Sequence, residues 1–438
     1  MSRRAHVIGA GVAGLHAALL LADRGFAVQL HESRPRLGGR AFTLPRERGG
    51  MECDNGPHVI LGCYRDFRQL LRRIGAESCF EFAPALRVAY RGRDGRASAL
   101  ELSRLPIPFA MPLALMGTGM NFGSCLRALR GMLGVLLGCA PQLTLQQWLD
   151  RSGQQGDPAA LLWVPLCRAL MNAEPAEVQA RIFLRTLREA FRFSAAGGAI
   201  ALPRTTWGEI LDGPAEAALA GAGIALHKGS RVAGFEVREA AVHALVFTDG
   251  SRTAIDPSDL VVSAVPWHAY GALDGAPPAG PGALASSPIV SVWFRMQSAA
   301  DAPLRGEALV AFVDGDPFHF LVRRPGGDPR DFAVLAGGCR ALDGLPVAEV
   351  RSAAERQLCR HAPGFDPAAV AEAHVTKEAR ATFVAAVGSE PLRPRPGTLA
   401  GGPANLVVCG DWTDCGLPAT LEGAARSARI ALAAIGLR

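Results

Sequence analysis

The feature that most constrains this 438-residue chain is a stretch near its amino terminus, VIGAGVAGLHAALLLADRGFAVQLHE, at residues 7–32. A short apolar run leads into three glycines with GxGxxG spacing, Gly9, Gly11 and Gly14, and a segment with helical periodicity follows. A second apolar run ends at Glu32, where a carboxylate can accept the ribose hydroxyls of an adenosine. This order of strand, glycine turn, helix, strand and acid predicts a βαβ unit that binds a dinucleotide.

Each glycine of this turn has its own physical reason. Gly9 permits the tight turn, Gly11 leaves room for the pyrophosphate, and Gly14 lets the helix pack closely against the strand. Backbone N–H groups at the start of the helix point toward the phosphates, so Val12 and Ala13 belong to the predicted contacts. A glycine turn with a coincidental acid would not explain the regular order of the elements.

A second glycine pair follows the acid at once, in the stretch SRPRLGGRAFT at residues 33–43. Gly38 and Gly39 can present backbone N–H groups to a phosphate, and Arg40 can add a charge-assisted contact. Ser33 and Arg34 are also predicted to contact the cofactor. Together, GxGxxG, the acid and GGR resemble the amino-terminal signature of the FAD-binding amine oxidase and phytoene desaturase superfamily. That resemblance implies FAD rather than NAD.

The other end of the chain carries a second unit of this kind, NLVVCGDWTDCGLPATLEGAARSARIALAAIG, at residues 405–436. An apolar strand is predicted before Asp411, whose carboxylate can accept from ribityl hydroxyls, and a helix is predicted to start at Pro418. The N-terminus of that helix can direct N–H groups and its positive dipole end at an anionic oxygen of the flavin ring. The predicted contacts in this unit are Gly410, Asp411, Ala419, Thr420 and Leu421.

A third segment is expected to join these two units. Residues 230–266 alternate like a small antiparallel ribbon with a TDGS turn at 248–251, and they end in the apolar strand DLVVSAVP. In the superfamily just named, the strand that opens such a ribbon passes the adenine. The resemblance therefore implies a backbone contact at Val232.

These segments predict an α/β fold with two domains. A discontinuous, Rossmann-like FAD-binding domain is expected from residues 1–75, 225–270 and 395–438. An inserted α+β substrate-binding domain is expected from residues 76–224 and 271–394, which mix apolar helical patterns with strands.

Four stretches go beyond the superfamily and resemble the hydroxysqualene dehydroxylases, also described as squalene-associated FAD-dependent desaturases. They are DNGPHVILGCYRDFRQLLRRIGA (54–76), LLWVPLCRALMNAEP (161–175), ARATFVAA (379–386) and GDWTDCGLPATLEGAARSAR (410–429). The resemblance implies a reduced flavin that delivers a hydride to hydroxysqualene while the hydroxyl leaves, giving squalene for hopanoid or triterpene biosynthesis. Three positions depart from the usual pattern of that family, with Pro57 in place of Gln, Cys415 in place of Thr, and Ala428 in place of Gly.

The reaction implied by this resemblance needs an acid, because a hydroxyl is a poor leaving group unless it is protonated or strongly hydrogen-bonded. The carbon left behind becomes cationic, so the pocket around it has to be dry and apolar. His58, with Asp54 as its partner, is the predicted proton donor. Gly56, Pro57 and His58 are also expected beside the flavin.

Other residues leave the chemistry open. Asp414 and Glu422 offer carboxyl groups in the carboxyl-terminal unit, and Asp414 is expected to act as a cap near the helix start. Amine oxidases of the superfamily often place a lysine near flavin N5, whereas Lys228 and Lys377, the only lysines of this chain, lie in no matching motif. The alternatives are a carotenoid or polyprenoid desaturase, an amine oxidase-like flavoenzyme, and a flavin-containing lipid carrier.

Residues 105–140 are strongly apolar, but prolines and arginines interrupt them, so they contain no run of about 20 apolar residues that could span a bilayer. We expect this segment to line the entrance of an apolar tunnel, to dip into a membrane surface, or to form the core of the substrate domain. The side chains considered are Phe109, Met111, Leu113, Leu115, Met116 and Met120. An apolar substrate implies a cytoplasmic protein that is peripheral to the inner membrane, with hydroxysqualene-forming synthases as candidate partners.

Composition argues against several other classes of protein. The net charge of +6 comes with no long basic run that contains interleaved aromatic residues, so we expect no nucleic-acid partner. The ten cysteines form no CxxC pair, so we expect no metal site. Because no His or Cys stands in a recognisable flavin-attachment motif, FAD is expected to bind non-covalently.

Overall fold

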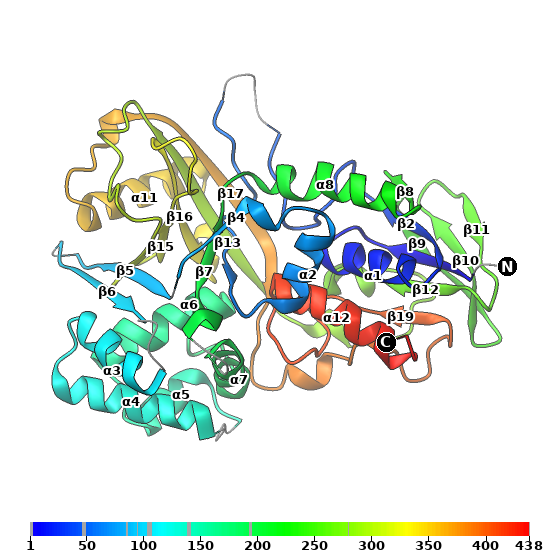
Figure 1. Ribbon diagram of the computed structural model, residues 1–438, viewed down its shortest axis with the longest axis horizontal. Coiled ribbons are helices and arrows are strands. Elements are labelled where there is room, and N and C mark those ends of the chain that lie inside the picture. The colour runs from blue at the N-terminus through cyan, green and yellow to red at the C-terminus, as the bar shows by residue number, and fades with distance from the viewer. Residues whose placement is uncertain are drawn as a thin grey trace.

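The computed structural model describes residues 3–45, 50–84, 86–93, 95–102, 107–137, 142–191, 195–278 and 280–437. Two main sheets lie side by side along the long axis of the molecule, and a group of helices packs below the second sheet (Figure 1). The amino terminus lies at one end of that axis, and helices α3 and α4 lie at the other end.

The first sheet is six-stranded, with the order β18-β19-β12-β1-β2-β8. Its strands are β1 (Arg4–Ile8), β2 (Ala27–Glu32), β8 (Ala225–Lys228), β12 (Leu260–Ser263), β18 (Gly397–Thr398) and β19 (Leu406–Val408). Every neighbouring pair is parallel except β18 and β19. Because a parallel sheet is covered on both faces, its strands are short apolar runs, and β12 is buried along its whole length. The predicted α/β fold class is confirmed.

Four helices pack with this sheet: α1 (Val12–Ala22), α2 (Arg65–Arg73), α8 (Trp207–Gly221) and α12 (Leu421–Ala434). Helix α12 contacts both α1 and α2, so the carboxyl-terminal helix lies against the amino-terminal one (Figure 1). Helix α1 is buried on nearly all sides, which explains why its sequence has no polar face. Helix α8 contacts β8 and joins the core of this sheet, although its residues fall in the range predicted for the substrate domain.

A small antiparallel sheet covers one side of the first sheet. It consists of β9 (Val232–Arg238), β10 (Ala241–Phe247) and β11 (Arg252–Ala254), in the order β11-β10-β9. Strand β10 ends at Phe247 and β11 begins at Arg252, which confirms the ribbon and its TDGS turn. Apolar side chains of the ribbon pack against Ile8, Val261 and Leu406 of the six-stranded sheet.

The second sheet has seven strands, in the order β17-β13-β16-β15-β14-β5-β6. Its strands are β5 (Arg87–Arg91), β6 (Ala97–Glu101), β13 (Ser286–Met296), β14 (Leu309–Phe312), β15 (Phe320–Val322), β16 (Asp331–Gly337) and β17 (Val370–Phe383). Helices α10 (Arg340–Asp343) and α11 (Val347–His361) contact its long strands, and α11 shares an apolar core with β13 and β16. A further short sheet of β3 (Ile60–Leu61), β7 (Ile200–Pro203) and β4 (Phe80–Phe82) lies between the two large ones (Figure 1).

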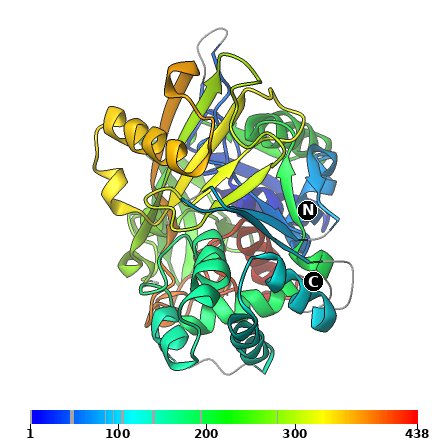
Figure 2. The same ribbon diagram turned by 90° about the vertical axis from the view of Figure 1, so that its left-hand side faces the viewer.

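The group of helices below the second sheet contains α3 (Ile107–Gly117), α4 (Phe122–Leu137), α5 (Leu145–Arg151), α6 (Val164–Met171) and α7 (Ala180–Phe191), and one π-helical turn, Ala159–Trp163, precedes α6. Figure 2 shows the group from the side, with the second sheet above it. Asn172 ends α6 with a left-handed backbone, φ 50°, a conformation that is common just past the last turn of a helix. Helix α9 (Trp267–Tyr270) follows β12 elsewhere in the chain.

The apolar segment at 105–140 forms α3 and α4 over its described residues, 107–137. Met111, Leu115 and Met120 are buried in the core of the helical group, so of the alternatives for these three side chains the core is confirmed. Leu113 and Met116 point outward. The side chain of Phe109 lies outside the described residues. Among the helices described, none combines the length and apolar character that crossing a bilayer requires.

Candidate functional site

The site begins at the carboxyl end of β1, where the chain turns sharply into α1. Gly9 has φ +96°, a conformation that a side chain would strain. A Cβ atom on Gly14 would lie 1.8 Å from the carbonyl oxygen of Gly9, so helix and turn meet without room for a side chain. Gly11 is the N-cap of α1, and no described side chain caps the helix or adds an acid to its first turn. The N–H groups of this helix start can therefore bind an anion.

The second glycine pair lies directly against the first. Gly38 forms a β-bridge with Gly11, and its N–H donates to the carbonyl of Ala10 at 2.9 Å. A Cβ atom on Gly39 would lie 3.1 Å from the Cα of Gly11. We call Gly9, Gly11, Gly14, Gly38 and Gly39 the glycine cradle. Because the cradle has two facing backbone segments without side chains, it fits a pyrophosphate between them.

Glu32 closes the cradle on the side of β2. Its carboxylate accepts from the N–H of Ala10 at 2.7 Å and from the N–H of Arg34 at 2.8 Å, and the hydroxyl of Ser33 lies 3.2 Å away. The side chain is buried, yet a carboxylate has about four acceptor positions, so capacity remains for a ribose hydroxyl. The carbonyl of Glu32 also accepts from the N–H of Ser230 at 2.8 Å.

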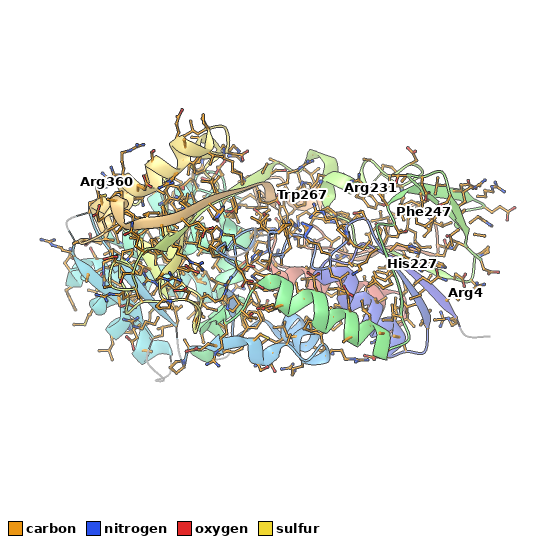
Figure 3. The ribbon with its side chains drawn as sticks, turned by 90° about the horizontal axis from the view of Figure 1, so that it is seen from above. Arg4, His227, Arg231, Phe247, Trp267 and Arg360 are labelled. Carbon is orange, nitrogen blue, oxygen red and sulfur yellow. The ribbon has the colours of Figure 1, made fainter. Side chains whose placement is uncertain are left out.

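That last bond brings the start of the ribbon to the cradle. Val232, the first residue of β9, is buried beside the six-stranded sheet and follows Ser230 by two positions. In Figure 3, Arg231, Phe247 and His227 lie at the ribbon end of the molecule, and Trp267 lies nearer its middle. The structure thus places Val232 near Glu32, although its contact with an adenine stays a prediction.

The carboxyl-terminal unit reaches the same region from the other end of the chain. Helix α12 begins at Leu421 rather than at Pro418, so the predicted start is wrong by three residues. The reason is the cap: the Thr420 hydroxyl accepts from the N–H of Gly423 at 2.9 Å and satisfies the first turn. A Cβ on Gly423 would lie 2.9 Å from the carbonyl oxygen of Pro418, because the preceding loop folds back over this turn.

Arg40 and Asp411 connect the two ends of the chain. The guanidinium donates to the Asp411 carboxylate at 2.7 Å and to the carbonyl of Ala381 at 2.5 Å, and it lies over the ring of Trp267 at 5.2 Å. The structure therefore shows these two predicted cofactor contacts bound to each other. Contacts of Arg40 with a phosphate and of Asp411 with ribityl hydroxyls stay predictions.

Asp54 is buried and has three hydrogen-bond partners. One oxygen accepts from the Thr43 hydroxyl at 2.8 Å and from the N–H of Trp207 at 3.0 Å, and the other accepts from Arg324 at 2.9 Å. No hydrogen bond joins Asp54 to His58 within the described part of the chain. These contacts hold the loop of Asp54, the start of α8 and the guanidinium of Arg324 together. In this arrangement Asp54 has a structural role.

His58 follows Gly56 and Pro57 and lies close to the same loop. Its Nδ1 lies 2.8 Å from the carbonyl oxygen of Gly56, and its ring meets Trp207 edge-on at 5.1 Å. Burial lowers the pKa of His58, more than the Gly56 carbonyl and Asp54 raise it, so the neutral imidazole is favoured. With a hydrogen on Nδ1, its Nε2 is an acceptor. The ring must take up a proton before it can donate one.

The carboxyl-terminal unit holds a second buried carboxyl group, Glu422. It accepts from the N–H of Phe67 at 3.0 Å, at the start of α2, and from Arg426 at 3.1 Å. Burial raises the pKa of Glu422 against the opposing effect of these donors. A small cavity adjoins this carboxylate, lined by Leu61, Cys63, Tyr64, Leu170, Thr186, Glu189, Ala190, Leu417, Thr420 and Arg426. The sequence signal available for Glu422 was its position at the start of the predicted carboxyl-terminal helix, α12.

Two further residues of the unit differ from expectation or were missed. Asp414 accepts from the N–H of Gly416 at 3.2 Å, so it stabilises the loop and does not cap α12. Arg393 is buried and donates to the carbonyls of Trp412, Thr413 and Leu417, at 3.1, 2.7 and 2.7 Å. It therefore holds the loop that carries Asp411 to α12. A lone arginine in a proline-rich joint had no sequence signal for this role.

Both lysines are bound outside the glycine cradle. Lys228 pairs with Glu216 at 2.7 Å on the side of α8, and Lys377 donates to the carbonyls of Asp343 and Leu345. Each lysine therefore has its own partner in the structure, and a place for either of them near a flavin is not part of the predicted site.

Comparisons with known proteins agree with this geometry. Residues 12–435 match the family model for flavin containing amine oxidoreductases. The chain is 30% identical to a hydroxysqualene dehydroxylase of Rhodopseudomonas palustris over 98% of this chain and 97% of that protein. It is 28% identical to the hydroxysqualene dehydroxylase of Sinorhizobium fredii, with the same coverage. A zeta-carotene desaturase of Zea mays is 40% identical, but over only 16% of this chain and 12% of that protein.

Solved structures share the fold. An oxidoreductase from Methanosarcina mazei has a TM-score of 0.73 at 16% identity, covering 97% of this chain and 99% of that one. A putrescine oxidase bound to putrescine has a TM-score of 0.72 at 13% identity, with complete coverage of both chains. The glycine cradle, the uncapped start of α1 and the match along the chain lead to one conclusion. This chain is a flavin-dependent oxidoreductase that belongs to the flavin containing amine oxidoreductase family and is similar along its length to hydroxysqualene dehydroxylases.

Proposed function

We propose that the protein binds FAD non-covalently and replaces the hydroxyl of hydroxysqualene with a hydride, giving squalene. The observation that carries this proposal is the extent of similarity. Hydroxysqualene dehydroxylases match 97–98% of the chain, whereas zeta-carotene desaturases match 16% of it at about 40% identity or 60% of it at 22% identity. The similarity to hydroxysqualene dehydroxylases covers both sheets and the helical group. It therefore includes the proposed substrate-binding domain as well as the nucleotide turn.

The six-stranded sheet with its ribbon is the proposed FAD-binding domain, formed by residues 1–75, 225–270 and 395–438. The glycine cradle suits the pyrophosphate, Glu32 suits the adenosine ribose, and the start of α12 is proposed to lie at the flavin ring. The second sheet and the helical group form the proposed substrate-binding domain. These assignments are supported by the meeting of the three segments around the cradle.

Bound FAD, in its reduced form, would supply the hydride for the reaction. The chain itself has to exclude water and provide a proton for the hydroxyl. Partly buried apolar side chains that pack against the core of the helical group, among them Leu61, Leu170 and Ile200, are the proposed wall of a dry chamber for a long hydrocarbon. His58 is the proposed proton donor: it would take up a proton at Nε2 while the Gly56 carbonyl holds Nδ1.

The test is a product analysis under defined redox conditions. Purified protein should show a flavin absorption spectrum and release FAD on mild denaturation. Under anaerobic conditions with dithionite and hydroxysqualene, gas chromatography with mass spectrometry should detect squalene. Release of no flavin, or unchanged hydroxysqualene with fully reduced flavin, would reject the proposal.

A carotenoid or polyprenoid desaturase is the second candidate function, favoured by the local similarity of about 40% to zeta-carotene desaturases. That reaction runs in the opposite redox direction, since the oxidised flavin removes a hydride. Incubating the oxidised protein with phytoene or zeta-carotene separates the two, because a desaturase yields a product that absorbs at longer wavelength.

We further propose a cytoplasmic protein that works at the inner membrane. Hydroxysqualene and squalene are long hydrocarbons that reside in bilayers, so an enzyme that uses them has to collect them there. Synthases that form hydroxysqualene are the proposed functional partners. Co-purification of the protein with cytoplasmic membranes after mild lysis, reversed by detergent, is the expected result.

A further inference from the structure

Helices α3 and α4 present an unusual apolar surface to solvent. Ten large hydrophobic side chains are exposed among the residues that the structure describes, and seven of them lie on these two helices. The seven are Leu113, Met116, Phe122, Leu126, Leu133, Leu136 and Leu137, and we call them the α3–α4 apolar face. The exposed fraction reaches 76% for Phe122 and 70% for Leu137. Contiguous exposed apolar surface of this kind marks an interaction site.

The spacing of these residues makes one continuous surface on α4. Phe122, Leu126, Leu133 and Leu137 differ by four, seven and four positions, so they lie along one side of the helix. Helix α3 contacts α4 and adds Leu113 and Met116. Figure 1 shows both helices at the outer edge of the helical group, away from the six-stranded sheet.

The buried side of α4 shows that this face is not needed for the protein core. That side consists of Ser124, Cys125, Ala128, Gly131, Met132 and Val135. A surface helix normally buries its large apolar residues and exposes polar ones. In α4 the larger side chains face outward and the smaller ones inward, which suits an apolar medium outside the protein.

The charges around the α3–α4 apolar face indicate which kind of apolar medium it contacts. No Asp or Glu occurs between Glu101 and Asp150, whereas Arg127 and Arg130 lie exposed on α4 beside the apolar face. The acid nearest the helix start, Asp157, already accepts from Asn121 at 3.2 Å and from Ser124 at 3.0 Å. The surface is therefore apolar at its centre and positively charged at its margin.

We infer that the α3–α4 apolar face docks onto an anionic lipid bilayer, with Arg127 and Arg130 at the level of the lipid phosphates. Leucine and phenylalanine side chains would enter the boundary between headgroups and acyl chains, as in interfacial amphipathic helices. The inference rests on the proposed function only for the identity of the lipid-borne substrate. It assigns the membrane contact to specific side chains, and these differ from the buried methionines of the same segment.

A second copy of the chain fits this surface less well. A two-fold interface places the same patch against itself, which brings Arg127 and Arg130 of two copies close together. No acid between residues 102 and 149 could pair with them, and like charges at an interface are unfavourable. An anionic bilayer supplies the opposite charge over the whole margin of the face.

The experiment is vesicle flotation with the full-length, FAD-loaded protein. The probes are phosphatidylcholine vesicles and vesicles that also contain phosphatidylglycerol. The variant Leu126→Asn/Leu133→Asn/Leu137→Asn tests the apolar face, and Arg127→Gln/Arg130→Gln tests the charges. The matched control is Val237→Asn/Val347→Asn, which changes exposed valines elsewhere in the protein. Circular dichroism checks that each variant is folded.

The unaltered protein and the valine control should float with phosphatidylglycerol vesicles. The leucine variant should bind roughly tenfold more weakly or worse, because each asparagine removes an apolar side chain from the lipid. The arginine variant should lose about fivefold in affinity for each charge on phosphatidylglycerol vesicles, and little on phosphatidylcholine. Higher salt should reduce that difference.

Equal flotation of the leucine variant and the unaltered protein would overturn the inference. So would a dimer that the leucine variant abolishes while neither protein binds vesicles. Turnover of detergent-solubilised hydroxysqualene keeps this test separate from the proposed function. If no protein makes squalene but the unaltered one floats, the proposed reaction fails and the docking surface stands.

Discussion

Arg40 and Asp411 form an ion pair of 2.7 Å, although 371 positions separate them in the chain. Arg40 follows the second glycine pair, and Asp411 follows β19, so the bond joins the amino-terminal turn to the carboxyl-terminal unit. The same guanidinium donates to the carbonyl of Ala381 in β17. One side chain therefore ties the first sheet to the second at the edge of the glycine cradle.

The first prediction concerns this link. Arg40→Gln should lower the free energy of unfolding by about 2 kcal/mol, because charge-assisted bonds are lost and Asp411 stays buried without its partner. The variant should also retain less flavin after gel filtration. Urea unfolding and the ratio of flavin to protein absorbance measure both effects. Arg73→Gln is the control: both side chains of its pair with Asp23 are exposed, so less than about 1 kcal/mol should be lost.

The second prediction separates two glycines of the cradle. A Cβ on Gly11 meets no atom closer than the Cα of Gly39, at 3.8 Å, so Gly11→Ala should fold normally. The new methyl group would occupy the place proposed for the pyrophosphate, and flavin binding should weaken at least tenfold. Gly14→Ala should instead unfold, because its Cβ would lie 1.8 Å from the Gly9 oxygen. Thermal unfolding and flavin titration distinguish the cases; a Gly11→Ala protein with normal flavin affinity would contradict the placement of the pyrophosphate.

The third prediction tests whether Asp54 acts through structure or chemistry. Asp54→Asn should lower the free energy of unfolding by about 3 kcal/mol, because Arg324 loses its buried partner. Arg324→Gln should have a similar effect, and the double variant should lose less than the sum of the two. His58→Gln should leave urea stability nearly unchanged while squalene formation falls. Additive losses at Asp54 and Arg324 would show that the ion pair is not the source of the stability.

The fourth prediction is a pH dependence of stability. Burial, with smaller effects of His227 and His6, lowers the pKa of His31 to about 4, while an unfolded histidine has a pKa of about 6.5. Between these values the unfolded chain binds the proton and the folded chain does not. The contribution of His31 to stability should be complete above about pH 6.5, should fall toward pH 4 by up to ~1.4 kcal/mol per pH unit, and should level off below that.

His31→Gln should make this slope shallower but should not remove it, because burial also lowers the pKa values of His268 and His319, whereas His374→Gln, at an exposed position of β17, should leave the slope unchanged. Urea unfolding at a series of pH values provides the comparison. The His31 ring stacks on His227 at 4.9 Å, and its Nδ1 lies 3.2 Å from the Ser230 hydroxyl, next to the segment that touches Glu32. Flavin affinity should therefore weaken over the same pH range, and a slope identical in both variants would exclude His31 as its origin.

Much of the nucleotide-binding unit could be predicted because its signals are local. The glycine spacing, the apolar strands and the acid at Glu32 depend on neighbours in the chain, and so does the TDGS turn of the ribbon. The start of α12 was predicted three residues early, since the helix begins where the Thr420 hydroxyl can accept from an N–H of the first turn, and not at Pro418. Such capping geometry is decided by a loop that folds back on itself.

Partner choice over long range could not be predicted. Asp54 was expected to pair with His58, four residues away, but its carboxylate lies against Arg324, Thr43 and Trp207 instead. Arg393 showed no sequence signal at all, because three carbonyl groups of a distant loop define its role. Several arginines of the chain could have paired with Asp54 or bound these loop carbonyls, and only tertiary packing determines which arginine lies at each place.

The sequence by itself determined the βαβ unit, the α/β class and the family, because glycine spacing and hydrophobic periodicity act over a few residues and leave few alternatives. The tertiary structure alone decided which apolar residues of 107–137 are buried and which face outward, and where Arg40, Asp54 and Arg393 find their partners. The physical reason is that an apolar side chain or a charge carries no information about its neighbour. Close packing of two sheets and a group of helices fixes that neighbour when the chain folds.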